Sequence, residues 1–349
     1  MPLTPSVAET PENESLTSPA ANEERRAAHP IRNAILIYNP VSGRRRSRRL
    51  IEIETAGKLL SDAGISIEFA PTFEPGSGTS IARHAVEQKF DLVIACGGDG
   101  TANEIVNGLA GSSVPLALLP AGTANILAKE LGIPWNIPAA ARLIPHSRPR
   151  RIALGCLAPV APDGGELQGE ARYFLCVGGS GPDGAIVNGV DPKLKKKIGT
   201  FAYWAEGMRQ VFTYKFPLMR VESSERTEEA TIVVVGRTAE YGGPFRITDR
   251  ASLYEDSFEV LTFSTQSGLR YLLALPALYF GKLRGVRGIS SWKTSDVTCT
   301  ALPGGTLYAH VDGEPAGALP LRFRIVPDAL TLMVPTASPN GNHSPKASK

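Results

Sequence analysis

Gly97-Gly98-Asp99-Gly100-Thr101 determines how the rest of the sequence is interpreted. The stretch follows residues 91–95, which are apolar after the first, and precedes residues 102–109, which have helical spacing. A strand that is apolar throughout is typical of a parallel sheet buried on both faces. Glycines between such a strand and a helix leave backbone N–H groups and the helix dipole accessible to a phosphate. The stretch therefore predicts a nucleotide-phosphate site; the alternative is an ordinary strand-to-helix turn with a capping residue.

The same order of strand and helix extends on both sides of this loop. Strand-like runs at 35–38, 65–70, 91–95 and 115–119 alternate with helical spacing at 50–63, 81–86, 102–109 and 125–131. Alternation of this kind is typical of a parallel sheet with helices on both faces. We therefore expect an α/β fold, with a doubly wound Rossmann-like domain over residues 31–147 that binds a nucleotide.

Beyond about residue 145 the pattern changes to short β-type runs separated by Gly and Pro. These runs lie at 173–177, 220–221, 231–235, 258–263, 307–311 and 322–325, with helical candidates at 200–212 and 269–283. The pattern predicts a mainly β domain, a sandwich, over residues 148–335, with room for the last strand to return to the first domain. Residues 1–30 and 336–349 are polar and are expected to be disordered extensions.

The bulk composition narrows the class of protein. The chain has 349 residues, is 42% hydrophobic and carries a net charge of +3, which gives no argument for a nucleic-acid partner. Its four cysteines form no CxxC pair, which favours buried thiols in a reducing compartment. We expect no secretory signal and no spanning helix. A cytoplasmic protein follows, with peripheral contact at the inner face of the membrane.

Two further polar loops follow strands of the expected sheet. Asn39-Pro40-Val41-Ser42-Gly43 ends the first strand, and Pro120-Ala121-Gly122-Thr123-Ala124-Asn125 ends the fourth. Loops at the carboxyl ends of parallel strands converge on the ligand. The candidate nucleotide-binding residues are Asn39, Pro40, Ser42, Gly43, Gly97, Gly98, Asp99, Gly100, Thr101, Asn103, Glu104, Gly122, Thr123 and Asn125. The arginines that follow the first loop (44, 45, 46, 48 and 49) form either a solvated helix face or contacts to phosphates or an anionic membrane.

Two carboxylates are the candidates for the chemistry. Asp99 cannot bind phosphate directly, so we expect it to hold Mg²⁺ through water. Glu314 belongs to Asp312-Gly313-Glu314, a turn after the run at 307–311. It is either the base that takes the proton from an acceptor hydroxyl or an ordinary exposed acid in a turn.

The order of these four motifs resembles the diacylglycerol kinase catalytic-domain family, which includes bacterial lipid kinases, sphingosine kinases and ceramide kinases. The likeness spans about residues 31–335 and is supported by Thr72, by Asp183 within 179–184 and by Tyr241-Gly242-Gly243. The resemblance implies that the glycine loop, Thr72 and the Gly122-Thr123 pair bind ATP, and that Glu314 is the general base. It implies a Mg²⁺-dependent lipid kinase that phosphorylates a lipid hydroxyl, of diacylglycerol or a sphingoid or related lipid, at a membrane surface.

The sequence departs from the family pattern at two places. Ile126 occupies a position where many bacterial members have an aspartate that joins a water and Mg²⁺ network, so more depends on Asp99. Where members carry an Asp-Gly pair that in some binds a structural Mg²⁺, this chain has Glu255-Asp256-Ser257-Phe258-Glu259. Glu255 is the candidate ligand there, although its side chain is longer and the glycine is absent.

Two segments are candidates for contact with lipid. Residues 269–283 are apolar almost all round, which fits a buried core helix or a membrane-docking surface. Lysines 193, 195, 196 and 197 lie near Phe201, Tyr203 and Trp204, either as a headgroup-binding loop or as a solvated one.

Two other functions fit part of the pattern. NAD kinase-like and phosphofructokinase-like enzymes share the glycine loop, but the loop at 39–43 and Glu314 argue against them. A nucleotide-binding regulator without catalysis is supported by Ile126 and the altered loop at Glu255, and opposed by the retention of Asp99 and Glu314. The sequence leaves the oligomeric state open and is compatible with a homodimer.

Overall fold

A computed structural model of the protein describes residues 31–40, 46–161, 164–165, 167, 171–189, 209, 214–242, 245–280 and 282–336. The chain divides into two compact units, Met1–Pro30 and Ile31–Lys349, of which the first lies outside the described residues. The expectations for Ser42, Gly43, the lysine loop at 193–197, most of the helix at 200–212 and the tail at 337–349 also fall outside them.

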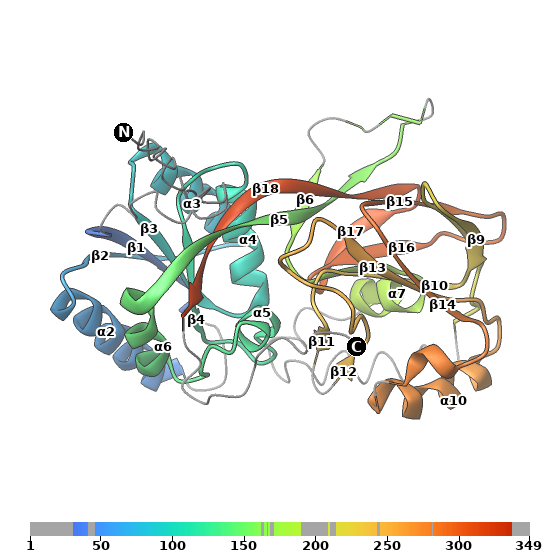
Figure 1. The fold of residues 1–349 in the computed structure, drawn as a ribbon, viewed down its shortest axis with the longest axis horizontal. Coiled ribbons are helices and arrows are strands. Elements are labelled where there is room, and N and C mark those ends of the chain that lie inside the picture. Colours follow the sequence, from blue (N-terminus) through green and yellow to red (C-terminus); the bar gives the residue numbers. More distant parts are fainter. Residues whose placement is uncertain are drawn as a thin grey trace, which may run out of the picture. The chain divides into compact units, whose positions relative to one another are not determined.

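The first lobe of the second unit has the expected strand–helix alternation (Figure 1). Its elements are β1 (Asn33–Tyr38), α2 (Arg46–Asp62), β2 (Ser66–Pro71), α3 (Ser77–Glu87), β3 (Leu92–Gly97), α4 (Asp99–Leu109), β4 (Leu116–Pro120), α5 (Ile126–Glu130), α6 (Ile137–Leu143) and η1 (Ile144–His146). The strands pair in parallel in the order β2-β1-β3-β4. β3 and β4 are buried along their whole length, as apolar strands between two helical layers must be.

Two long strands then join this lobe to the next one. β5 (Ser147–Pro159) and β18 (Leu321–Pro335) form an antiparallel ribbon that runs between the lobes (Figure 1). One end of β18 pairs with β4 at Leu332 and Leu116, and the other end pairs with β15 (Asp296–Ala301). A single sheet therefore extends from the first lobe into the second lobe.

The second lobe is a sandwich of two antiparallel layers. One layer continues the large sheet through β15 to β8 (Met219–Glu222) and β9 (Thr227–Ala230), and β6 (Arg172–Phe174) pairs with β5. The other has the order β14-β13-β10-β7-β16-β17. Its strands are β7 (Val177–Ser180), β10 (Ile232–Gly236), β13 (Phe258–Phe263), β14 (Ile289–Thr294), β16 (Tyr308–Val311) and β17 (Glu314–Ala318). A short hairpin, β11 (Glu240–Gly242) and β12 (Phe245–Arg246), and the helices α7 (Pro182–Gly189), α10 (Gly268–Tyr279) and η2 (Leu283–Gly285) complete the lobe.

Aromatic side chains fill the space between the two layers. Phe174 stacks on Phe258 with ring centroids 5.8 Å apart and meets Phe323 edge-on at 6.1 Å. Because these rings come from both layers, they form one sandwich core. The predicted fold class, a Rossmann-like domain followed by a β sandwich, is thereby confirmed.

Three further features bear on the expectations. The four cysteines are free and buried. Among the described helices, none combines the length and the apolar character needed to cross a membrane. α10 is buried on one side only, with Leu269 and Leu273 exposed, so it is not the fully buried core helix that was one interpretation of its sequence.

Candidate active site

Four loops meet at the carboxyl edge of the parallel sheet, and backbone hydrogen bonds tie them together. Beyond the strand ends, Asn39 donates from its N–H to Cys96, Ala121 to Gly97 and Thr72 to Tyr38, at 3.2, 2.8 and 2.8 Å. These bonds continue the sheet pairing into the loops. The segments containing Asn39, Thr72, the glycine loop and Gly122 therefore lie side by side, as the rule for parallel sheets predicts.

The glycines of this edge allow close approaches that a side chain would block. A Cβ on Gly122 would lie 2.4 Å from the Cα of Gly98, so the two loops touch through their backbones. A Cβ on Gly97 would lie 2.5 Å from the side chain of Thr101. A Cβ on Gly100 would lie 3.2 Å from Oε1 of Glu314. The glycine loop is thus packed against Gly122 on one side and faces the carboxylate of Glu314 on another.

Asp312 anchors the turn that carries Glu314. Its carboxylate accepts hydrogen bonds from the backbone N–H groups of Leu175, Cys176 and Val177 at 2.9 to 3.0 Å, and from Nδ2 of Asn103 at 2.9 Å. Asp312 has φ of 48° and Gly313 has φ of 78°, the left-handed geometry of a tight hairpin turn. Asp312, in the second lobe, is therefore bound directly to helix α4 of the first lobe.

Several predicted nucleotide ligands also make bonds within the protein. Asn103 is 3% exposed and donates to the carbonyl of Tyr173 as well as to Asp312. Asn107, one turn later, exchanges two hydrogen bonds with the backbone of Tyr173. Together these two amides attach α4 to β6. The sequence motifs predict a nucleotide contact for Asn103 and no role for Asn107.

The third loop is held in shape by Asn125. Its side chain accepts from the N–H of Gly122 at 2.9 Å and donates to the carbonyl of the same residue at 3.1 Å, and it is 4% exposed. Thr101 is buried as well, whereas Thr123 is exposed. Glu104 accepts from the N–H of Gly78 at the start of α3. Of this group, Thr123 is the side chain that is open to a ligand.

Asp99 lies at the start of α4 and bonds across to the next helix. Its Oδ1 accepts the N–H of Ile126, the first residue of α5, at 2.7 Å. Burial raises the pKa of Asp99 to about 6; backbone hydrogen bonds oppose this rise, and the charge of Asp312 adds to it. The backbone N–H of Ile126 therefore binds Asp99 directly. Many bacterial members of the family that the motifs resemble have a second aspartate at this position.

Arg49, on α2, belongs to the arginine run and lies near the same edge. The Nε atom of Arg49 is buried and has no hydrogen-bond partner among the residues that the structure describes. Its charge is close enough to Cys96, the residue before the glycine loop, to counter the rise in thiol pKa that burial produces there. A buried guanidinium nitrogen without a partner is suited to an anion. Arg48 instead pairs with Glu52 on the same helix, 3.4 Å away.

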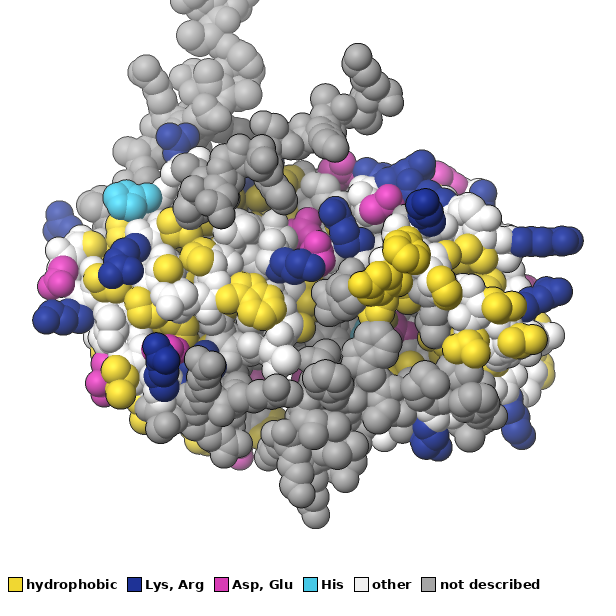
Figure 2. All heavy atoms as spheres, turned by 90° about the horizontal axis from the view of Figure 1, so that it is seen from below, with side chains coloured by type: hydrophobic (Ala, Val, Ile, Leu, Met, Phe, Trp, Pro, Cys, Tyr) yellow, Lys and Arg dark blue, Asp and Glu magenta, His cyan; other side chains and the backbone are white. Residues whose placement is uncertain are grey.

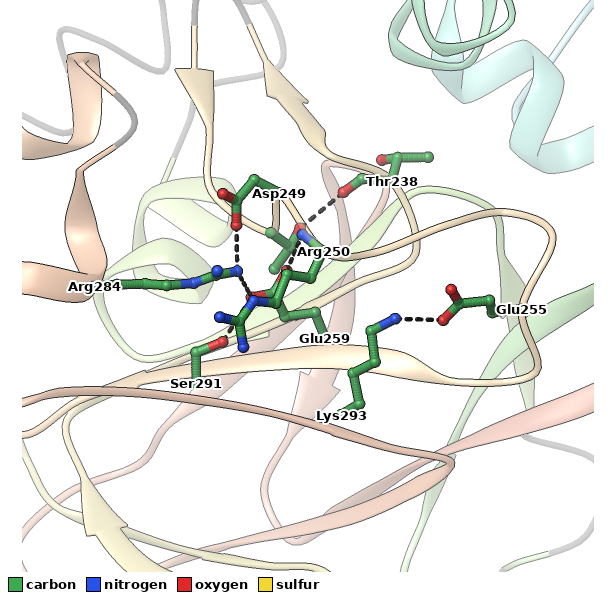
Figure 3. A network of polar contacts seen from close by, with 9 residues as sticks. Thr238, Asp249, Arg250, Glu255, Glu259, Arg284, Ser291 and Lys293 are labelled. Carbon is green, nitrogen blue, oxygen red and sulfur yellow. Dashed lines mark hydrogen bonds and ion pairs between the residues drawn. The ribbon is translucent and has the colours of Figure 1, made fainter. Parts of the chain in front are cut away.

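The loop around Glu255 does not fit a metal ion. Glu255 is paired with Lys293, and buried Glu259 accepts from Ser291, from Arg284 and from the backbone of Arg250 (Figure 3). Arg237 is fully buried and donates to the carbonyls of Glu255, Ser257, Ala153 and Leu253 at 2.9 to 3.4 Å. Burial lowers the pKa of Arg237 to about 10, against the nearby charge of Asp256. Lys293 and Arg237 thus bind the side-chain carboxylate and the backbone carbonyl of Glu255, and no group of three acids, histidines or cysteines among the described residues could bind a metal ion.

A buried histidine–aspartate pair involves the strand that leads into the Asp312 turn. Nε2 of His310, on β16, is 2.5 Å from Oδ2 of Asp183, at the start of α7. Burial alone would raise the pKa of Asp183, but the charge and hydrogen bond of His310, with a hydrogen bond from Tyr241, lower it. Burial alone would lower the pKa of His310, but the charge and hydrogen bond of Asp183 raise it. Each group therefore favours the charged form of the other, and His310 lies two residues before Asp312.

A glycine loop at a parallel-sheet edge is faced by a carboxylate from a β-sandwich lobe, so both lobes contribute to the candidate site. Residues 33–157 match the diacylglycerol kinase catalytic domain, and residues 177–334 match the YegS C-terminal NAD kinase beta sandwich-like domain. The chain contains a diacylglycerol kinase catalytic domain, as its motifs predicted.

Individual relatives are similar to this chain over most of its length. A diacylglycerol kinase of Bacillus subtilis (strain 168) is 28% identical over 298 residues, covering 84% of this chain and 93% of that protein. A diacylglycerol kinase of Staphylococcus aureus (strain bovine RF122 / ET3-1) is also 28% identical, covering 84% and 89%. The crystal structure of a diacylglycerol kinase from Bacillus anthracis str. Sterne has a TM-score of 0.67 at 24% identity, covering 87% of this chain and 97% of that one. This last likeness concerns the fold alone.

Proposed function

We propose that this protein is a lipid kinase that transfers the γ-phosphoryl group of ATP to a lipid hydroxyl in a Mg²⁺-dependent reaction. The observation that carries the proposal is the position of Glu314, whose Oε1 would lie 3.2 Å from a Cβ on Gly100. Phosphoryl transfer to an alcohol needs a carboxylate beside the phosphate site to take the hydroxyl proton. A protein that only binds a nucleotide has no need of a second-lobe acid at this place.

Each group at the site has a role in this proposal. The backbone N–H groups of Gly98 and Gly100, at the start of α4, bind phosphate oxygens, and the guanidinium of Arg49 adds positive charge. Asp99 holds the cation through water, and its pKa of about 6 means that it ionises fully when a cation is near. Bound ATP supplies the phosphoryl group, and Mg²⁺ neutralises the charge that develops on it. Glu314 accepts the proton of the acceptor hydroxyl, and Asp312 fixes the turn that positions it.

The names of the relatives support a diacylglycerol as the acceptor. A sphingoid base or another lipid alcohol offers the same chemical group, a hydroxyl on a largely apolar molecule. NAD belongs among the test acceptors because the second matching domain is described as NAD kinase sandwich-like. We further propose a cytoplasmic protein that meets its acceptor at the inner membrane surface.

An acceptor panel tests the proposal. The purified protein is incubated with labelled ATP and Mg²⁺ and with diacylglycerol, sphingosine, ceramide, phosphatidylglycerol or NAD. Label on a lipid is the expected result; label on NAD alone would overturn the lipid assignment, and no label on any acceptor would favour a regulator.

The role of Glu314 is tested by Glu314→Gln, which keeps the shape of the side chain and removes the base. We expect nucleotide binding to be retained while turnover falls by about 10²- to 10⁴-fold, the usual contribution of a general base. Calorimetric titration with a non-hydrolysable ATP analogue provides the binding control. Normal turnover in this variant would show that another group takes the proton.

A further inference from the structure

Helix α10 presents an apolar stripe to solvent. Leu269, Leu273, Pro276 and Phe280 recur at spacings of four, three and four residues, which puts them on one face of the helix. The stripe is exposed on that face: Leu269 by 66%, Leu273 by 69% and Phe280 by 70%. The opposite side packs on the core through Ala274, with Tyr271 and Leu278 beside it. An ordinary surface helix is polar toward solvent, so this helix has an apolar face without a described partner.

Aromatic rings extend the apolar stripe at its carboxyl end. The ring of Tyr279 is 59% exposed and lies 5.3 Å from Phe280 and 6.5 Å from Phe245, which is on β12. The rings meet edge-on, so they form one cluster that α10 and the β11–β12 hairpin share. Exposed aromatic rings with a polar edge are enriched where a protein enters the headgroup region of a bilayer.

The chain segment that carries this surface has basic residues and no acidic ones. From residue 265 to residue 295 the sequence contains no Asp or Glu and five basic residues. Two of these, Arg284 and Lys293, are paired with acids of neighbouring segments. Arg270, Lys282 and Arg287 are exposed. In Figure 2 the hydrophobic side chains gather on the part of this face where α10 lies in Figure 1, and Lys and Arg side chains project around them.

We propose that the α10 stripe, with its aromatic end and basic rim, is the surface by which this protein docks on an anionic lipid bilayer. The inference rests on the proposed function, because it places the lobe that carries Glu314 against the source of a lipid acceptor. Apolar side chains insert at the boundary of the acyl chains while Lys and Arg attract anionic headgroups. A second copy of this chain is the less suitable occupant, since a two-fold contact would bring the same basic rim against itself.

The inner side of α10 links this surface to the site. Tyr271, on that side, is close enough to Asp183 for the charge of the carboxylate to act on its hydroxyl. Asp183 in turn pairs with His310, on the strand that leads into Asp312 and Glu314. The docking surface and the proposed base therefore belong to one packed lobe.

Vesicle flotation tests the docking surface without requiring any activity. The double variant Leu269→Glu/Leu273→Glu places charge on the stripe, and Trp135→Glu, at an exposed ring of the first lobe, is the matched control. The wild-type protein and the control should float with vesicles of phosphatidylcholine and phosphatidylglycerol, and the double variant should bind at least about tenfold more weakly. Equal binding by wild type and double variant would overturn the proposal, as would a wild-type protein that does not float.

A charge variant provides a second test that does not depend on the apolar stripe. Lys282→Gln/Arg287→Gln removes two exposed charges and should weaken binding to the anionic vesicles by roughly thirtyfold. Unchanged affinity would contradict the role of the basic rim. Sedimentation is compared for the same proteins. If the wild type is a dimer, the stripe variant is a monomer and neither binds vesicles, the surface is a contact between copies and the proposal is wrong.

An activity comparison separates this proposal from the proposed function. With a short-chain diacylglycerol dispersed in solution, the stripe variant should turn over like the wild type. With a long-chain diacylglycerol in anionic vesicles it should be at least about tenfold slower. Equal loss with both acceptors would place the effect in the catalytic site and overturn the docking role. If no acceptor is labelled by any variant, the proposed function fails, while flotation still decides the docking surface.

Discussion

Asp99→Asn should make the protein more stable above neutral pH while it removes the carboxylate proposed to hold the cation. Asp99 has a pKa of about 6 in the fold, against an ordinary value of 3.8. The native state therefore keeps the proton up to a higher pH than the unfolded state. Ionisation then costs native stability above about pH 6, and this cost disappears below about pH 4. A difference of about two pH units corresponds to about 3 kcal/mol, an upper value for a group that is partly exposed.

Urea unfolding in the presence of a chelator and without nucleotide measures this effect. The asparagine side chain still accepts the N–H of Ile126, so we expect the variant to be more stable at pH 8, by up to about 3 kcal/mol, and by only about a third as much at pH 4.5. Asp62→Asn, at an exposed position near the end of α2, is the control and should show no such difference. The reasoning is refuted if the Asp99 variant is less stable at pH 8, or if its advantage is the same at both pH values.

Three further predictions concern the buried polar groups. Asp312→Asn leaves one amide oxygen where a carboxylate accepts four N–H groups, so thermal unfolding should show a loss of about 2 to 4 kcal/mol; an unchanged melting temperature would contradict the anchoring role. His310→Gln breaks the pair with Asp183 and should cost about 3 kcal/mol at pH 6. The raised pKa of His310 means that its contribution is present below about pH 6.5 and disappears as pH rises through the folded pKa, so a deficit that grows with pH would refute the pairing. Arg237→Met leaves four carbonyls without their donor and should cost about 3 kcal/mol or more, whereas a chelator should leave the wild-type melting temperature unchanged; a lower one would indicate a structural metal ion.

The sequence predicted the first lobe more fully than the second. Strands β1, β3 and β4 are short apolar runs between helices, and both faces are covered, so composition alone marks them. Strand β5 contains Pro149 and three arginines in its first half, which is exposed, and no pattern marks such a segment as a strand. Its pairing with β18, more than 160 residues away, stabilises it instead. Helix α6 was missed, although Asn136 caps it by accepting the N–H of Ala139, a signal visible in the sequence.

The candidate site was predicted as a set of loops but not as a network. The glycine loop and the loop at Gly122 are close because the strands before them are neighbours, which the order of elements implies. The bonds of Asp312, the attachment of α4 to β6 and the carbonyls around Arg237 all join residues far apart in the sequence. No local pattern encodes those partners. A buried arginine such as Arg237 looks like any surface arginine until the fold is known.

The ribbon of β5 and β18 has a consequence for synthesis on the ribosome. β18 is the last described strand, and it lies between β4 and β15 in the large sheet. Until residues 321–335 have left the exit tunnel, the edge of β4 that β18 will occupy has no partner. An uncovered apolar strand edge is a template for pairing with other chains. The first lobe, although it emerges first, therefore cannot close its sheet before β18 has been synthesised, and a nascent chain stalled before residue 321 should be a target for chaperones.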